Sequence, residues 1–217
     1  MDIATLYVTA QRSFCELFAS LDDGERALPV PCNPLWSVRD VLSHVAGIAD
    51  DVVEGRVEGA ATDPWTAVQV ERWRGTDWRA LVDQWSDQAP MVGSMLAAIE
   101  ERRPPLDCHS HEHDVRHAVG RAGNQDSDLI RWMSTLFDDS SVGRSVEVHF
   151  ADGATTVIDG DDPAIELRNI SRFEFVRSRL GRRSRAQVAA YAWSEAPHHA
   201  LLDEWFVFGP ASDDIDE

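Results

Sequence analysis

The chain has 217 residues, of which 43% are hydrophobic, enough for one large domain or for a helical bundle with a small appendage. Its formal net charge of −18 argues against nucleic acid as a partner, because an acidic surface repels phosphate. All 20 basic residues are arginine, which excludes chemistry that needs a lysine, such as a Schiff base or the Gly-Lys pair of a phosphate-binding loop.

The first half of the chain carries apolar side chains at helical spacing. Apolar residues that recur at intervals of three and four predict helices over 2–21, over 37–52 and over 78–99. Ser37 is suited to cap the second of these helices, because Asp40 stands where the carboxylate of a capping box reaches back.

Prolines mark the interruptions and ends of these helices. Pro90 lies within the third periodic run and should kink or restart that helix. The pair Pro104-Pro105 should stop it, and a fourth helix should run over about 106–119 and be closed by Gly120. Prolines at positions 29, 31 and 34 predict extended backbone between the first two helices.

After Ser140 the apolar period changes from about 3.6 to 2, which is typical of strands. The alternation over 146–150, the turn pair Asp152-Gly153 and the stretch 155–158 predict a β-hairpin. The remaining elements are expected in chain order: an amphipathic helix before the hairpin at 129–137, a strand at 165–167, helices over 172–180 and 184–193, and a closing strand over 205–208.

These elements predict a mainly α fold. We assign residues 1–140 to a helical bundle, 141–210 to a small α+β portion, and the aspartate-rich residues 211–217 to a disordered tail. No stretch reaches the about 18 consecutive apolar residues of a membrane span, and the first residues lack the pattern of a signal peptide. We therefore expect a cytoplasmic protein with no membrane partner.

Three cysteines, Cys15, Cys32 and Cys108, form no CxxC pair. In a reducing compartment this pattern indicates three free thiols rather than a disulfide framework. Cys108 lies beside a group of histidines, but nothing in its surroundings indicates a lowered pKa, and we interpret it as a small buried residue.

Four of the eight histidines lie on the predicted fourth helix, at positions 109, 111, 113 and 117. Residues four apart share a helix face, so Asp107 and His111 form one candidate pair of metal ligands. This pair lines up with the apolar stripe that should face the bundle. The pairs among the other three histidines should rotate toward solvent or the flanks. Asp114 could orient a ligand histidine or pair with Arg116, or it could be an ordinary surface acid.

A third ligand must come from another helix, and His44 lies on the inward face of the second one. Two histidines and one carboxylate leave positions open for water or substrate, as in catalytic metal sites. Zinc, iron(II), manganese and nickel all tolerate such a set. Two ordinary readings stay open: His44 could be a core histidine, and the histidine-rich helix could be a solvated face. The carboxylate could also be Glu112 or Asp114.

Residues 34–47, PLWSVRDVLSHVAG, resemble a motif of the mycothiol-dependent maleylpyruvate isomerase-like family, within the DinB/YfiT-like superfamily of metal-binding bundles. Residues 107–120 resemble the family's second signature, and residues 181–187 resemble a third, so the resemblance covers nearly the whole chain in order. It implies an antiparallel four-helix bundle with a small α+β C-terminal portion. It also implies that His44, Asp107 and His111 bind a divalent metal, usually zinc.

The resemblance implies an activity as well. We expect a metal-dependent enzyme that uses a low-molecular-weight thiol, mycothiol or a similar one, for isomerisation or S-transfer on a small electrophilic substrate. Arg182 matches an arginine that takes part in catalysis, whereas Arg183 and Arg185 fit a solvated charge run that neutralises nearby acids. The isomerases proper carry glutamate where this chain has Asp107, which puts the specific isomerase activity in question. Alternatives are a metal-hydroxide hydrolase and a non-catalytic stress protein that binds a metal or a small molecule.

Overall fold

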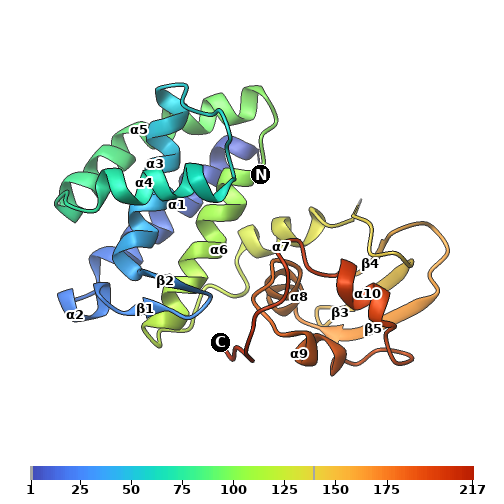
Figure 1. Cartoon of the computed structure of the whole chain (residues 1–217). Helices are drawn as coiled ribbons and strands as arrows, with labels where there is room; N and C mark the ends of the chain where they lie inside the picture. The colour runs from blue at the N-terminus through green and yellow to red at the C-terminus, as the bar shows by residue number, and fades with distance from the viewer. Residues whose placement is uncertain (1, 139) are drawn as a thin grey trace. The chain divides into compact units, whose positions relative to one another are not determined.

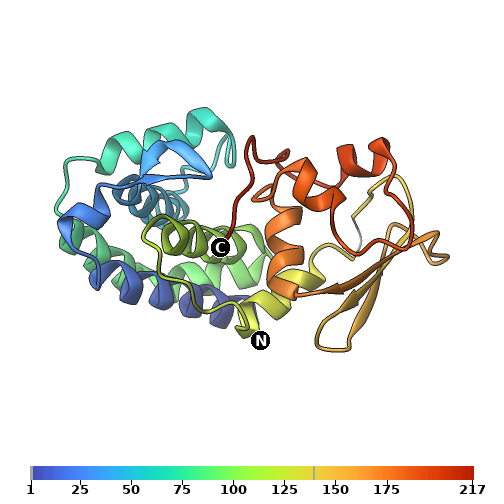
Figure 2. The same ribbon diagram turned by 90° about the horizontal axis from the view of Figure 1, so that it is seen from below.

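The computed structural model describes residues 2–138 and 140–217. These residues form two compact units, a helical unit up to Gly123 and a C-terminal unit from Asn124 on. Figures 1 and 2 show the helical unit in blue to green, and the C-terminal unit, with short helices and a small sheet, in yellow to red. The boundary lies earlier than the expected 140, because the helix α7 (Asp128–Thr135) packs on α8 (Arg172–Arg179).

Four long helices build the helical unit: α1 (Ile3–Ala19), α3 (Val38–Val53), α5 (Trp78–Ala98) and α6 (Arg103–Ala118). α1 packs against α5 and α6, and α3 packs against the same two helices, so the four form a closed ring around one core. The core includes Leu6, Phe14, Leu42, Trp85 and Val92. The predicted mainly α bundle is confirmed.

The start of α3 follows the sequence signal. Ser37 accepts a hydrogen bond from the backbone N–H of Asp40, and the Asp40 carboxylate accepts one from the backbone N–H of Ser37. This capping box fixes which residues of α3 face the bundle. The segment before it holds a single short turn of helix, α2 (Asp23–Arg26), and a small antiparallel hairpin, β1 (Pro29–Val30) with β2 (Asn33–Ser37).

A further helix, α4 (Asp63–Trp73), packs on α3 and was not predicted. Its apolar pattern is weak, because its two buried residues are Gln69, which is polar, and Val70. The approach of α4 is close at Gly47, where an added Cβ would lie 2.8 Å from Cβ of Gln69. A glycine at this position of α3 therefore leaves the space that α4 fills.

Two expectations about prolines are corrected. α5 runs without interruption through Pro90, so this proline does not restart the helix. α6 begins at Arg103, before Pro104 and Pro105, rather than after them. Prolines fit in the first turn of a helix, because the N–H groups there have no partner within the helix. Gly120, at φ +64°, follows the end of α6 as expected.

The C-terminal unit contains a three-stranded sheet in the order β4-β3-β5. β3 (Val146–Phe150) pairs antiparallel with β4 (Thr155–Ile158) and parallel with β5 (Ile165–Ile170). The predicted hairpin is confirmed, with Gly153 at φ +87° in its turn. Three helices follow the sheet in sequence: α8, α9 (Arg185–Ala189) and α10 (His199–Glu204).

The last part of the chain differs from expectation. Residues 205–208 are not a strand: Trp205 and Phe206 are both buried, while the next two residues are exposed, so burial does not alternate. Residues 211–217, expected to be disordered, make hydrogen bonds. Ser184 donates to Asp214, and the side chain of Gln187 donates to the backbone carbonyl of Ile215.

No helix in the described part of the chain is long and apolar enough to cross a membrane. Cys15, Cys32 and Cys108 form no disulfide bond, as expected.

Candidate metal centre

Two helices of the helical unit bring the three predicted ligands together. His44 comes from the middle of α3, and Asp107 and His111 lie one turn apart on α6. One Asp107 oxygen lies 3.2 Å from Nε2 of His44, and the other lies 3.5 Å from Nε2 of His111. The three donor atoms all lie within 4.8 Å of one another. The predicted pair on α6, Asp107 and His111, therefore faces the predicted residue on α3, His44.

Both histidines present Nε2 to this place because other residues engage Nδ1. Nδ1 of His111 lies 2.9 Å from a carboxylate oxygen of Asp114. Nδ1 of His44 lies 2.8 Å from Oε1 of Gln69. An imidazole held by its Nδ1–H has its lone pair on Nε2, where a metal can bind. Of the three readings of Asp114, its burial and its contact with Nδ1 of His111 favour the one in which it orients a candidate ligand histidine.

The centre is enclosed on one side and open on another. The side chains of His44 and His111 are each 6% exposed, whereas the side chain of Asp107 is 34% exposed. The ring of Trp36 lies 5.1 Å from the His44 ring and 5.9 Å from the His111 ring, between centroids. Trp36 thus forms an apolar wall beside the two histidines, and solvent reaches Asp107.

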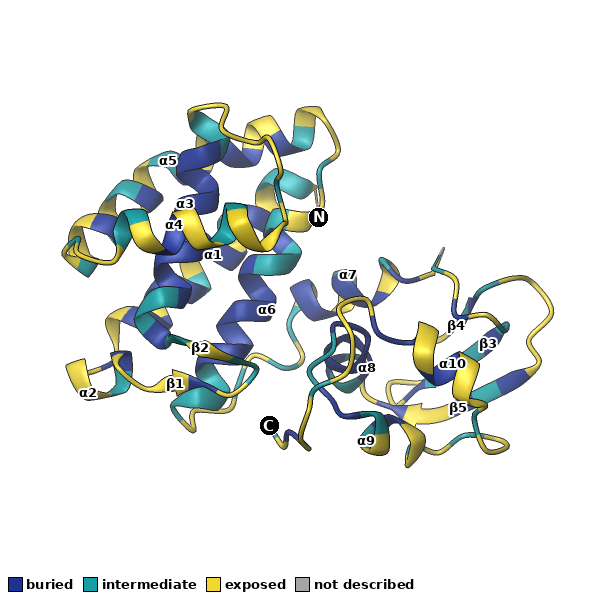
Figure 3. Cartoon of the chain, in the orientation of Figure 1, coloured by how far each residue is buried: buried dark blue, intermediate teal, exposed yellow. Residues whose placement is uncertain are grey.

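The other histidines of α6 are not where the sequence placed them. His109 and His113 are buried, with ring centroids 4.8 Å apart, rather than rotated toward solvent. The reason is that α6 packs against both α1 and α3, so more than one of its faces is enclosed, as Figure 3 shows by its dark ribbon. Glu112 contacts Nδ1 of His109 at 3.0 Å, accepts a hydrogen bond from Arg116 and forms an ion pair with it.

Cys108 lies beside Asp107 in sequence and is 1% exposed. Burial raises the pKa of its thiol well above the usual range, and the charge of Glu112 acts in the same direction. A thiol kept protonated is a poor nucleophile and a poor ligand. Cys108 is therefore a packing residue, as the sequence indicated.

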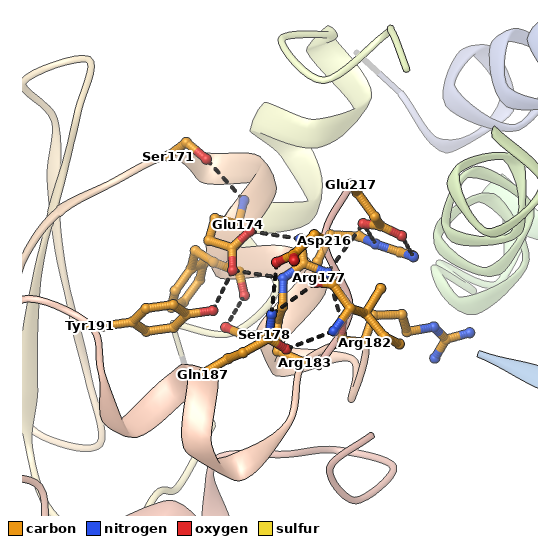
Figure 4. Close-up of polar contacts among 12 residues, drawn as sticks. Ser171, Glu174, Arg177, Ser178, Arg182, Arg183, Gln187, Tyr191, Asp216 and Glu217 are labelled. Atoms are coloured by element: carbon orange, nitrogen blue, oxygen red, sulfur yellow. Dashed lines mark hydrogen bonds and ion pairs between the residues drawn. The ribbon is translucent and has the colours of Figure 1, made fainter. Parts of the chain in front are cut away.

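The arginines of the third motif all lie in the C-terminal unit (Figure 4). Arg182 is half-buried and donates to the backbone carbonyl of Leu180 at 2.7 Å. Arg183 is 3% exposed and pairs with Glu174 and Glu217, so the expectation that it is solvated is wrong, although it does neutralise acids. Burial lowers the pKa of Arg183, but these ion pairs outweigh burial and raise it. Arg185 is half-buried, with 41% of its side chain exposed, and pairs with Asp203.

A family model described as the mycothiol maleylpyruvate isomerase N-terminal domain matches residues 8–123, more than half of the chain. The chain belongs to this family. The matched span contains His44, Asp107 and His111, whereas Arg182 lies outside it. A search of curated proteins found no match.

The fold of this chain is similar to that of two solved isomerase structures. The mycothiol-dependent maleylpyruvate isomerase aligns with a TM-score of 0.56, and a histidine-to-alanine mutant of that enzyme with 0.57. Each is 10% identical, and each alignment covers 90% of this chain and 92% of that chain. The shared fold is a DinB/YfiT-like bundle followed by a smaller C-terminal part, as the sequence predicted.

Sequence reasoning missed one residue of the centre, Gln69, because α4 was not predicted. The available signal was the pair Asp63-Pro64 at the start of a 63–73 stretch, which suits the first turn of a helix. Nothing in the weak apolar pattern indicates that Gln69 is fully buried next to His44.

Proposed function

We propose that this family member is a metal-dependent enzyme that acts with mycothiol or a similar small thiol on a small electrophilic substrate. The observation that carries the proposal is the arrangement of three donor atoms from two helices, with both histidines turned to present Nε2. The family's name supports the thiol and an isomerisation. The centre alone is compatible with S-transfer as well.

The donor atoms fit a divalent metal such as zinc. Zinc lies about 2.0–2.2 Å from histidine nitrogens and carboxylate oxygens, so the donor atoms of a tetrahedral site are about 3.4 Å apart. One Asp107 oxygen lies 3.2 Å from Nε2 of His44 and the other lies 3.5 Å from Nε2 of His111, each close to that spacing, and all three donor atoms lie within 4.8 Å of one another. Nickel, manganese and iron(II) accept the same donors, and elemental analysis distinguishes them.

Each residue of the centre has a part in this proposal. His44, Asp107 and His111 would hold the ion and leave further coordination positions free for a ligand from solution. A bound divalent metal lowers the pKa of a coordinated thiol so that the thiolate is present at neutral pH. The exposed edge of Asp107 leaves access from solvent, and Trp36 excludes water from one side of the two histidines.

Arg182 is proposed as the residue that binds a carboxylate of the substrate. Arginine keeps its charge and donates two parallel hydrogen bonds to a carboxylate. Its backbone is well fixed: Arg182 N–H donates to the carbonyl of Arg177 at 2.9 Å, and Gly181 adopts φ +78°. A Cβ at Gly181 would lie 2.1 Å from the carbonyl oxygen of Gly209, so glycine is required there.

Calorimetric titration with mycothiol tests the proposal. The metal-loaded protein should bind the thiol, and the protein stripped by a chelator should not. The matched variant is Asp107→Asn, which keeps the shape of the side chain and removes its charge. If the loaded protein neither binds the thiol nor turns over a maleylpyruvate-type substrate, the thiol-dependent enzyme is ruled out. Hydrolysis of an ester by the loaded protein without thiol would favour a metal-hydroxide hydrolase instead.

A further inference from the structure

Gln69 is a fully buried polar residue on a helix that is otherwise mostly exposed or half-buried. Its Oε1 lies 2.8 Å from Nδ1 of His44, and its Nε2 donates to a carboxylate oxygen of Asp51 at 2.9 Å. A buried amide costs free energy unless both of its ends are hydrogen-bonded. Here both ends are, and one of the partners is a candidate metal ligand.

The direction of this chain of hydrogen bonds follows from its far end. Asp51 is 1% exposed and accepts hydrogen bonds from Arg56 at 2.8 Å and from Arg72 at 2.6 Å. A carboxylate held by two guanidinium groups is an acceptor only, so the NH₂ group of Gln69 must face it. The carbonyl oxygen of Gln69 must then face His44. Nδ1 of His44 therefore carries a proton, and in the neutral ring the lone pair then lies on Nε2, toward Asp107.

Gly47 makes this contact geometrically possible. It lies one turn after His44 on α3, and an added Cβ there would come within 2.8 Å of Cβ and 3.0 Å of Cγ of Gln69. A larger residue would push α4 outward and move Oε1 away from Nδ1. Glycine at position 47, the last residue of the first motif, thus allows the hydrogen bond between Gln69 and His44 as well as the packing of α4 on α3.

We propose that Gln69 is a positioning residue that sets the tautomer and orientation of His44, with Asp51 fixing the direction of the Gln69 amide. This inference rests on the proposed metal site. It makes the two histidines unequal: the neutral amide of Gln69 supports His44, whereas the carboxylate of Asp114 supports His111. The segment α4 is thereby part of the centre although it supplies no ligand.

The first test uses the metal-free protein, so it does not depend on the metal. Nitrogen-15 NMR of the histidine rings at about pH 8, where an ordinary imidazole is neutral, reports which nitrogen carries the proton. In the wild type, His44 should hold it on Nδ1. In Gln69→Leu, which has a similar shape and no acceptor, His44 should lose this preference. A His44 with its proton on Nε2 in the wild type would overturn the proposal.

The second test measures zinc affinity by competition with a chromophoric chelator. Gln69→Leu should weaken binding about 10–100-fold, as changes of an outer hydrogen-bond partner do. The double variant Gln69→Glu/Asp51→Asn keeps an acceptor facing His44 and reverses the second hydrogen bond, so that the amide at position 51 donates to the carboxylate at position 69. It should recover at least about tenfold relative to Gln69→Leu. The single variant Gln69→Glu sets two carboxylates against each other and should not.

The matched control is Glu71→Gln on the same helix, whose side chain is 74% exposed and pairs with Arg74. It should leave both the tautomer and the zinc affinity unchanged. Wild-type zinc affinity in Gln69→Leu would overturn the positioning role even if the metal site is real. If the wild type itself binds no zinc while the NMR result holds, the proposed function fails and the tautomer assignment stands.

Discussion

The carboxylate of Asp107 bridges the space between two histidines from different helices, with one oxygen 3.2 Å from Nε2 of His44 and the other 3.5 Å from Nε2 of His111. In a protein without a metal, a carboxylate would be expected to hydrogen-bond to both rings. That would require a proton on each Nε2. The contacts of Gln69 and Asp114 with the two Nδ1 atoms place a proton on each Nδ1, and a neutral ring then has no proton on Nε2. This geometry fits the proposal of three ligands around a shared cation.

His44→Ala should abolish stoichiometric metal binding, because the two ligands that remain come from one helix and cannot close the site. Metal content per chain, measured by elemental analysis after dialysis, checks this. His117→Ala is the control, since His117 is a half-buried residue of α6 that lies outside the centre. This variant should keep full occupancy. Full occupancy in His44→Ala would mean that the third ligand is another residue.

Asp107→Asn should weaken metal binding strongly, because the amide carries no charge and is a weaker donor. Asp107→Glu is the more discriminating variant, since one added methylene displaces the carboxylate while metal–oxygen distances tolerate only about 0.2 Å. We expect lower affinity or altered geometry in the cobalt-substituted spectrum. If the glutamate variant instead gains maleylpyruvate isomerase activity, this ligand alone separates the chain from such enzymes. Wild-type affinity in both variants would exclude Asp107 as a ligand.

Arg182→Ala should impair use of a carboxylate-bearing substrate and leave the metal content unchanged. The residue lies outside the helical unit that contains the candidate ligands, so we expect metal binding and substrate use to be separable. Steady-state kinetics with metal analysis of the same sample checks this. Arg185→Ala, at an arginine with 41% of its side chain exposed and paired with Asp203, is the control and should behave as the wild type. Unchanged kinetics in Arg182→Ala would remove the residue from the proposed mechanism.

Arg177 and Glu217 form a buried ion pair in the C-terminal unit, with side chains 1% and 4% exposed. Glu217→Ala should destabilise this unit by about 3–5 kcal/mol, because it leaves a buried guanidinium without this partner. Chemical denaturation followed by tryptophan fluorescence measures the change. The double variant Arg177→Met/Glu217→Leu should recover much of the loss, since it leaves no unpaired charge. A single variant as stable as the wild type would show that this contact does not hold residues 211–217.

The buried thiols should make stability fall at high pH. Burial raises the pKa of Cys15 to about 12 from its usual 9.0, and burial also raises that of Cys108. The unfolded chain loses these protons first, so the stabilisation is complete below about pH 9 and decreases as the pH rises toward 12. Cys15→Ser should reduce that decrease in thermal unfolding experiments. Cys32→Ser, at a half-buried position, should not change it.

The part of the centre that could be predicted from the sequence rests on strong local signals. The Ser37–Asp40 box fixes the start of α3, and the apolar stripe then places His44 on its inner face. A spacing of four puts Asp107 and His111 on one face of α6. These signals depend on residues that are close in sequence, so they can be recognised without knowledge of the tertiary structure.

The rest depends on packing between distant segments. Gln69 belongs to the centre only because Gly47 lets α4 approach α3, and no local pattern encodes that contact. His109 and His113 are buried because α6 is enclosed by two neighbours, whereas a single apolar stripe predicts one buried face. The aromatic segment at 205–208 favours a strand locally, but its first two residues both pack inward.

The most direct test of the account is to locate the metal. Crystals of the protein with its native metal, measured at the absorption edge of that element, should show one strong anomalous peak. The account predicts this peak about 2.1 Å from Nε2 of His44, Nε2 of His111 and one oxygen of Asp107. A peak beside His109 and His113 instead, or no peak between α3 and α6 at full metal content, would contradict it.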